Sequence, residues 1–352
     1  MILRRRTLAA ETRPRRALPG LVACLGALAA TACVDSTDPG RLPPEPAAPA
    51  APAPIVAPPP EPRPTSALRA ARAQRAAEQA RTASLAASTP ASQTMHGYFE
   101  GVEDMLTARG QLRRDDGRDI ALSAEQLTEN FVQIALYDEY WRDGAQLVAE
   151  ARPSKLRRWA QPVRVAVEFG ESVPPATRTR DRANVQSFTE RLARITGHDI
   201  AVTPGGGNFT VLFLNEDERR RIGPRLEALV PGIPGGDIQA IEGLPPQNYC
   251  TVFAYSIGAS PVYSEAVAII RAELPPGLRK SCIEEELAQG MGLANDSPEA
   301  RPSIFNDDEE FALLTHHDAL LLEILYDPRL RPGMTRDSAE PIVREIAANL
   351  LD

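Results

Sequence analysis

Apolar residues recur at helical or strand spacing only beyond about residue 90. Ser123–Trp141 has apolar side chains every three or four residues, and Ser123 with Gln126 matches the capping box that begins a helix. Asp181–Thr196 shows the same spacing and is followed by Gly197, a residue type that often ends helices. We therefore predict helices over both segments, and a third helix over Asp217–Val230.

Short apolar runs of strand type alternate with these helices. The clearest strand is Val163–Phe169, in which apolar and polar residues alternate with period two. Further strands are predicted over Thr210–Leu214, Cys250–Tyr255 and Ala266–Ile270. Alternating helices and strands predict an α/β fold. The run Gly205–Gly207 precedes a strand instead of opening a helix, which argues against a phosphate-binding loop.

The N-terminal quarter has a different composition and does not predict a core. Arginines between Arg4 and Arg16 precede an apolar stretch, Ala17–Ala32, that is too short to span a bilayer and is typical of a signal peptide. From Val34 to about Pro90 the chain is rich in proline and alanine, which favours an extended tether. We expect three parts: a signal peptide over 1–32, a tether over 33–90 and a folded domain over 91–352.

The end of the apolar stretch, Leu28–Cys33, resembles the lipobox of bacterial lipoproteins. The resemblance implies cleavage before Cys33, lipidation of its sulfur, and an outer-membrane anchor that leaves the domain facing the periplasm. The alternative is an ordinary signal peptide, with Cys33 unmodified.

Charge and cysteine content fit an exported protein. The formal net charge is −8, and removal of the arginine-rich N-terminus makes it more negative, so we expect no nucleic-acid partner. With Cys24 removed and Cys33 lipidated, Cys250 and Cys282 remain as one pair in an oxidising compartment, and we predict a disulfide between them. Free buried thiols are the alternative. A catalytic cysteine is less favoured, because neither residue has a histidine close by in sequence.

The segment Leu278–Asn295 carries the candidate chemistry. On a helix, Glu285 and Gln289 project from one face beside Glu286, and Gly292 would break the helix so that Asn295 turns back toward them. This spacing resembles the metzincin pattern His-Glu-x-x-His-x-x-Gly-x-x-His. The resemblance places Glu285, Gln289 and Asn295 at the three metal-ligand positions and Glu286 at the position of the general base.

Two later segments extend this resemblance. Ser303-Ile304-Phe305 is similar to the methionine-containing turn beneath the metal, with Phe305 in place of the methionine, and Leu314–Tyr326 is similar to the final helix. The resemblance covers roughly residues 163–326. It implies a zincin-like α/β (α+β) fold, with a mixed twisted sheet packed against an active-site helix and N-terminal helices added.

Three stretches also resemble a family of bacterial envelope lipoproteins called domain of unknown function 2927. They are Cys-Ile-x-Glu-Glu-Leu-x-Gln, Gly-Leu-Ala-Asn-Asp-Ser and Ser-Ile-Phe-Asn-Asp-Asp-Glu-Glu. This resemblance implies a location in the cell envelope but no activity.

The ligand positions argue against zinc, since one carboxylate and two neutral amides are poor zinc ligands. Oxygen donors suit calcium or magnesium better, but a regular calcium loop is missing, and we interpret Asp307–Glu310 as a solvated acidic face. We expect no cofactor. The simpler interpretation of Glu285, Gln289 and Asn295 is a hydrogen-bonded polar cluster where relatives hold a metal.

The sequence therefore favours a binding or scaffolding lipoprotein that meets an envelope protein or peptide, and not an enzyme. The rival hypothesis is a periplasmic hydrolase or peptidase that uses Glu286 with an oxygen-ligated metal. A third hypothesis is a purely structural protein attached to the cell wall, which would expose no groove beside Glu286.

Overall fold

The computed structural model describes residues 70–71, 74–75, 89–143, 146–306 and 308–352, with only the backbone described over 139–151. All of them belong to one compact unit, Arg63–Asp352. The expected signal peptide, nearly all of the expected tether and Cys33 lie outside the described residues.

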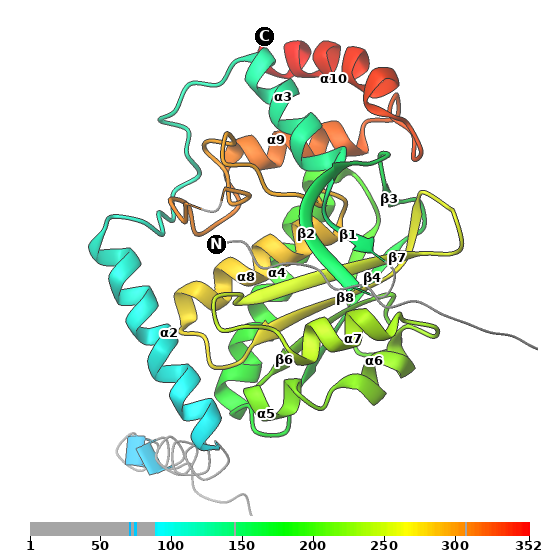
Figure 1. Ribbon diagram of the computed structural model, residues 1–352. Helices are drawn as coiled ribbons and strands as arrows, with labels where there is room; N and C mark the ends of the chain where they lie inside the picture. Colours follow the sequence, from blue (N-terminus) through cyan, green and yellow to red (C-terminus); the bar gives the residue numbers. More distant parts are fainter. Residues whose placement is uncertain (1–69, 72–73, 76–88, 144–145, 307) are drawn as a thin grey trace, which may run out of the picture. The chain divides into compact units, whose positions relative to one another are not determined.

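A six-stranded sheet forms the centre of the domain (Figure 1). Its strands are β3 (Arg158–Trp159), β4 (Val163–Phe169), β5 (Ile200–Thr203), β6 (Phe209–Leu214), β7 (Cys250–Ser256) and β8 (Val262–Arg271). Five strands run parallel in the order β3-β8-β6-β4-β5, and β7 pairs antiparallel with β8. Val267 of β8 pairs with both Thr210 of β6 and Phe253 of β7, so β6 and β7 lie on opposite sides of β8.

The other elements surround this sheet. The helices are α2 (Pro90–Ala108), α3 (Ala124–Ala135), α4 (Pro175–Thr196), α5 (Glu216–Arg219), α6 (Gly223–Leu229), α7 (Gly235–Glu242), α8 (Pro276–Gly290), α9 (His316–Tyr326) and α10 (Arg336–Leu351). A separate antiparallel hairpin consists of β1 (Tyr137–Asp143) and β2 (Gln146–Pro153). None of the described helices is both long and apolar enough to cross a membrane.

Apolar side chains cover both faces of the sheet, which explains the nearly continuous apolar run of β6. Phe209, Val211 and Phe213 lie in the main core with residues of α4 and α8. Leu212 and Leu214 lie in a second core with residues of α6 and α7. Successive side chains of a strand point to opposite faces, so the sheet is the middle of three layers (Figure 1).

The predicted α/β class is confirmed, and the four predicted strands correspond to β4, β6, β7 and β8. The capping box of Ser123 and Gln126 is present at α3. Gly197 ends α4 in a left-handed conformation, as its position predicted, although the helix begins at Pro175 and not at Asp181.

Two predicted helices are wrong in extent. The helix predicted to reach Trp141 ends at Ala135, and the following residues form β1, whose pairing with β2 overrides local helical spacing. The helix predicted over Asp217–Val230 is divided into α5 and α6. Pro224 lies in the first turn of α6, where its missing N–H is tolerated, whereas inside one continuous helix it would break a hydrogen bond.

Buried charge joins α5 to the sheet. The Glu216 carboxylate accepts hydrogen bonds from Arg219 at 2.9 Å and from Arg271 at 2.5 Å, and both arginine side chains are 1% exposed. Burial by itself would raise the pKa of Glu216, but hydrogen bonds from Arg219, Arg220 and Arg271 lower it to about 2. A depressed carboxyl pKa means that this group stabilises the fold above its ordinary value of 4.5, and that the contribution is lost as the pH falls toward 2.

Glu216→Gln leaves two buried guanidinium groups without their counter-charge. We expect the free energy of unfolding at neutral pH to fall by about 3 to 5 kcal/mol, measured by urea unfolding. The difference from the wild type should shrink between pH 4.5 and pH 2. The control is Glu227→Gln on the exposed face of α6, which should change little. Equal urea-unfolding midpoints for Glu216→Gln and Glu227→Gln would contradict the stabilising role assigned to the Glu216 carboxylate.

Candidate functional site: a cleft between strand β7 and helix α8

A cavity of about 1050 Å³ opens along β7. Every residue of β7 lines it, together with Glu285, Glu286 and Gln289 of α8. Other parts of the lining include Ser154, Lys155 and Arg157, the turn between β7 and β8, and Asp138, Tyr249, Ala294, Asp296 and Glu309. The cleft therefore has an extended strand on one side and the predicted active-site helix on another.

Close packing fixes the end of α8. A Cβ atom at Gly290 would lie 2.4 Å from the Phe209 ring, so glycine lets the helix approach β6 closely. Trp159 donates a hydrogen bond from Nε1 to the Gly290 carbonyl at 2.8 Å, which satisfies one terminal backbone group of the helix. Gly292 has φ of 126°, and its predicted role of breaking the helix is confirmed.

The three consecutive glutamates of α8 have different surroundings. Glu284 is buried away from the cleft, where it accepts a hydrogen bond from the Leu314 amide at 3.0 Å and pairs with Arg191. Burial raises the pKa of Glu284, against the opposing effects of the Leu314 amide, Lys280 and Arg191. Glu285 and Glu286 line the cleft, the first half-buried and the second 3% exposed.

The three predicted metal-ligand positions do not all come together. Gln289 donates a hydrogen bond to Asp296 at 3.1 Å. The Asn295 amide instead donates to the Gln133 carbonyl at 2.9 Å, and Asn295 does not line the cleft. In place of the expected Asn295, its neighbour Asp296 lies beside Gln289, because the backbone after Gly292 directs Asn295 toward the end of α3.

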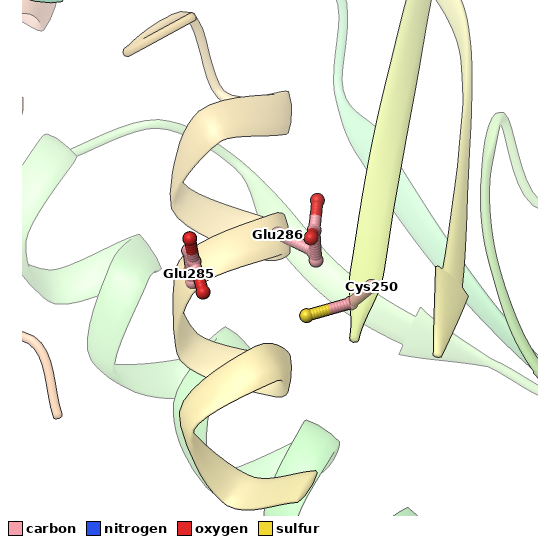
Figure 2. Close-up of side chains that lie close together, drawn as sticks. All are labelled: Cys250, Glu285 and Glu286. Carbon is pink, nitrogen blue, oxygen red and sulfur yellow. The ribbon is translucent and has the colours of Figure 1, made fainter. Parts of the chain in front are cut away.

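The predicted disulfide between Cys250 and Cys282 is confirmed, and it joins β7 to α8 with a Cα–Cα distance of 5.9 Å. The Cys250 sulfur points toward α8, beside Glu285 and Glu286 (Figure 2). This sulfur and one carboxylate oxygen of each glutamate lie within 4.8 Å of one another. A disulfide sulfur is not a thiolate, so the oxidised chain offers carboxylates but no sulfur ligand at this point.

The donors do not fit the zinc site that the metzincin resemblance implies. Glu285 supplies a carboxylate, but Gln289 is engaged with Asp296 and Asn295 is directed elsewhere. Tyr249 is one of the cleft-lining residues that the sequence did not single out. Burial raises the pKa of Tyr249 to about 12, and the nearby Glu309, Tyr98 and Glu285 add to the shift.

The predicted supporting turn is tied to α9 by a buried aspartate. Asp318 is fully buried and accepts hydrogen bonds from the Ser303 hydroxyl at 2.5 Å and the Ile304 amide at 3.1 Å. Phe305 is also fully buried, and its carbonyl accepts a hydrogen bond from the Ser297 amide at 2.8 Å. Because Ser297 directly follows Asp296, this turn helps to position the cleft wall.

His317, one of the two histidines that begin α9, takes part in that support. His317 is fully buried, with Nδ1 3.3 Å from Asp318 and Nε2 3.0 Å from the Asn130 amide. His316 is half-buried. Neither lines the cleft.

These features define an α/β domain with a cleft between an antiparallel edge strand and a helix. The chain belongs to the family described as "Protein of unknown function (DUF2927)", whose model matches residues 124–345. No curated protein and no solved structure matches the chain significantly. The matched range includes α8, β7 and the supporting turn.

Asp318→Asn removes the charge that organises the supporting turn. Burial by itself would raise the pKa of Asp318, but hydrogen bonds from His317, Ser303 and Thr315 lower it overall. The native carboxylate therefore stabilises the fold above its ordinary pKa of 3.8, and this contribution is lost in acid. We expect the variant to lose about 3 kcal/mol at neutral pH, measured by urea unfolding. The exposed Asp308→Asn is the control, and equal stability of the two variants would refute the assignment.

Proposed function

We propose that this chain is a cell-envelope lipoprotein whose folded domain binds an extended polypeptide segment along β7, without catalysing a reaction. The observation that carries the proposal is the open edge of β7. Within the part of the chain that the structure describes, β7 pairs only with β8. No described strand pairs with its other side, and strand addition at such an edge is a common way of binding peptides.

Packing on both faces of β7 supports this proposal. Cys250, Val252 and Ala254 pack against the main core, and Phe253 and Tyr255 against the second core. All seven residues of β7 are nevertheless only half-buried. With both faces packed, the outer edge is the direction from which a ligand would approach. A seven-residue strand has room for a peptide segment of about 23 Å.

Charged residues line two sides of the cleft and would orient such a peptide. Glu285, Glu286 and Asp296 lie at the α8 side, and Lys155 and Arg157 lie on another side, just before β3. A cleft of about 1050 Å³ is at the upper end of the range for small-molecule pockets. A bound segment of several residues would suit it better than a small metabolite.

The two rival hypotheses are less well supported. A hydrolase using Glu286 would need a metal held by ligands near it, but Asn295 is bonded to Gln133 and Gln289 to Asp296. A purely structural protein attached to the cell wall would lack a groove beside Glu286, and such a groove is present. Metal analysis of the oxidised chain with and without Glu285→Ala separates the hydrolase, since stoichiometric metal lost in the variant would favour it.

Peptide binding is tested by selecting peptides from a displayed random library on the full chain. Ser256→Trp puts a bulky side chain into the cleft at the end of β7. We expect it to weaken binding of selected peptides at least about tenfold, or roughly 1.4 kcal/mol, by fluorescence anisotropy. The control is Ser338→Trp on exposed α10, which should leave binding unchanged. If both variants weakened peptide binding equally, or if neither weakened it, the result would contradict the cleft as the binding site.

Lipidation at Cys33 is tested in a bacterial host by incorporation of radiolabelled palmitate. We expect the wild-type chain and Cys24→Ser to be labelled and to fractionate with the outer membrane, because the lipid is attached to Cys33. Cys33→Ser should lose both properties. A labelled Cys33→Ser chain, or an unlabelled wild type released in soluble form, would exclude the anchor and leave peptide binding to be judged separately.

A further inference from the structure

One face of α8 carries a stripe of metal-ligating side chains. Cys282, Glu285 and Glu286 stand at helical positions i, i+3 and i+4, which lie on the same side of a helix. Cys250 reaches this stripe from β7 (Figure 2). The Cys250 sulfur, which is bonded to Cys282, therefore lies beside two carboxylates where the strand and the helix touch.

The spacing of these atoms suits one small cation. The Cys250 sulfur and one oxygen each from Glu285 and Glu286 lie within 4.8 Å of one another. Zinc binds sulfur at about 2.3 Å and carboxylate oxygen at about 2.0 to 2.2 Å, which puts tetrahedral ligands roughly 3.3 to 3.8 Å apart. Small rotations of the side chains would close the remaining gap. The Cys282 sulfur is bonded to Cys250, and Cys282 stands about one turn before Glu285 and Glu286 on the same face of α8.

We propose that reduction of the Cys250–Cys282 disulfide converts this wall of the cleft into a zinc site with two thiolate and two carboxylate ligands. In the oxidised chain the sulfurs are bonded to each other and bind metal poorly. Reduction supplies two soft ligands, which favour zinc over calcium or magnesium. Two thiolates and two carboxylates around Zn²⁺ carry the same net charge as a four-cysteine zinc site.

The cleft gives a reductant access to one end of the disulfide. Cys250 lines the cavity, whereas Cys282 is 1% exposed. A small thiol would attack the Cys250 sulfur, form a mixed disulfide there and release the Cys282 thiolate. A second thiol then releases Cys250 and leaves as the oxidised reductant. Two thiols are consumed, two protein thiols form, and zinc binding displaces their two protons.

The proposal is independent of peptide binding, since it rests on the ligand stripe and not on the edge of β7. It is tested on the full chain, oxidised or reduced with a phosphine and then freed of reductant without oxygen. Co²⁺ serves as the spectroscopic probe and Zn²⁺ as the competitor. We expect one Co²⁺ per reduced chain, with a thiolate-to-cobalt charge-transfer band that Zn²⁺ abolishes, and no such band in the oxidised chain.

Variants separate a built site from incidental thiol binding. The double variant Glu285→Gln and Glu286→Gln keeps both cysteines, and we expect it to bind Zn²⁺ at least about tenfold more weakly than the reduced wild type. The matched control is Glu323→Gln on the exposed side of α9, which should bind like the wild type. Replacing both cysteines with serine should abolish the charge-transfer band that the reduced wild type shows.

Three results would overturn the proposal. The first is a reduced wild type that binds Co²⁺ without the thiolate band. The second is equal Zn²⁺ affinity in the wild type and the double glutamine variant. The third is a reduced chain that loses its circular dichroism signal and does not regain it on adding Zn²⁺, because the site would then not exist in a folded chain.

Discussion

The antiparallel pairing of β7 with β8 is the constraint on which the cleft depends. The pairing places β7 at the outer side of β8 and leaves its other side open within the described residues. The disulfide from Cys250 to Cys282 then holds this strand against α8. Apolar contacts also attach the strand to the helix, since Val252 and Ala254 pack against the core to which α8 also contributes.

Buried charges outside the cleft hold its walls in place. Glu216 joins α5 to the end of β8 through Arg271, and Asp318 joins α9 to the turn that follows the cleft wall. Glu284 ties α8 to Leu314 and to Arg191 of α4. These three carboxylates stabilise the elements around the cleft. Glu285 and Glu286, which follow Glu284 on α8, instead face the cleft.

Local sequence patterns predicted the elements that depend on nearby residues. The alternation in Val163–Phe169, the capping box at Ser123 and the glycine after Thr196 each specify a local structure, and each is present. The predicted helix through Trp141 failed because β1 forms by pairing with β2, a contact that helical spacing does not encode. The break before α6 had a local signal in Pro224, which the apolar periodicity outweighed.

The candidate site was also predictable only in part, because some of its contacts join residues that are far apart in the sequence. Helical spacing correctly placed Glu285, Glu286 and Gln289 together, and the cysteine count predicted the disulfide. Whether Asn295 or Asp296 turns toward Gln289 depends on the backbone beyond Gly292 and on the Gln133 carbonyl, which comes from a distant helix. The edge position of β7 depends on strand order, which no local pattern reveals.

Hydrogen exchange in the ligand-free chain tests the central claim, that the outer edge of β7 is open. Backbone amides of an edge strand alternate between the paired side and the open side. We predict fast exchange at alternate amides of Cys250–Ser256 and slow exchange throughout Ala266–Ile270, which is paired on both sides. Uniform protection of both strands would mean that the β7 edge is covered, and it would contradict the account.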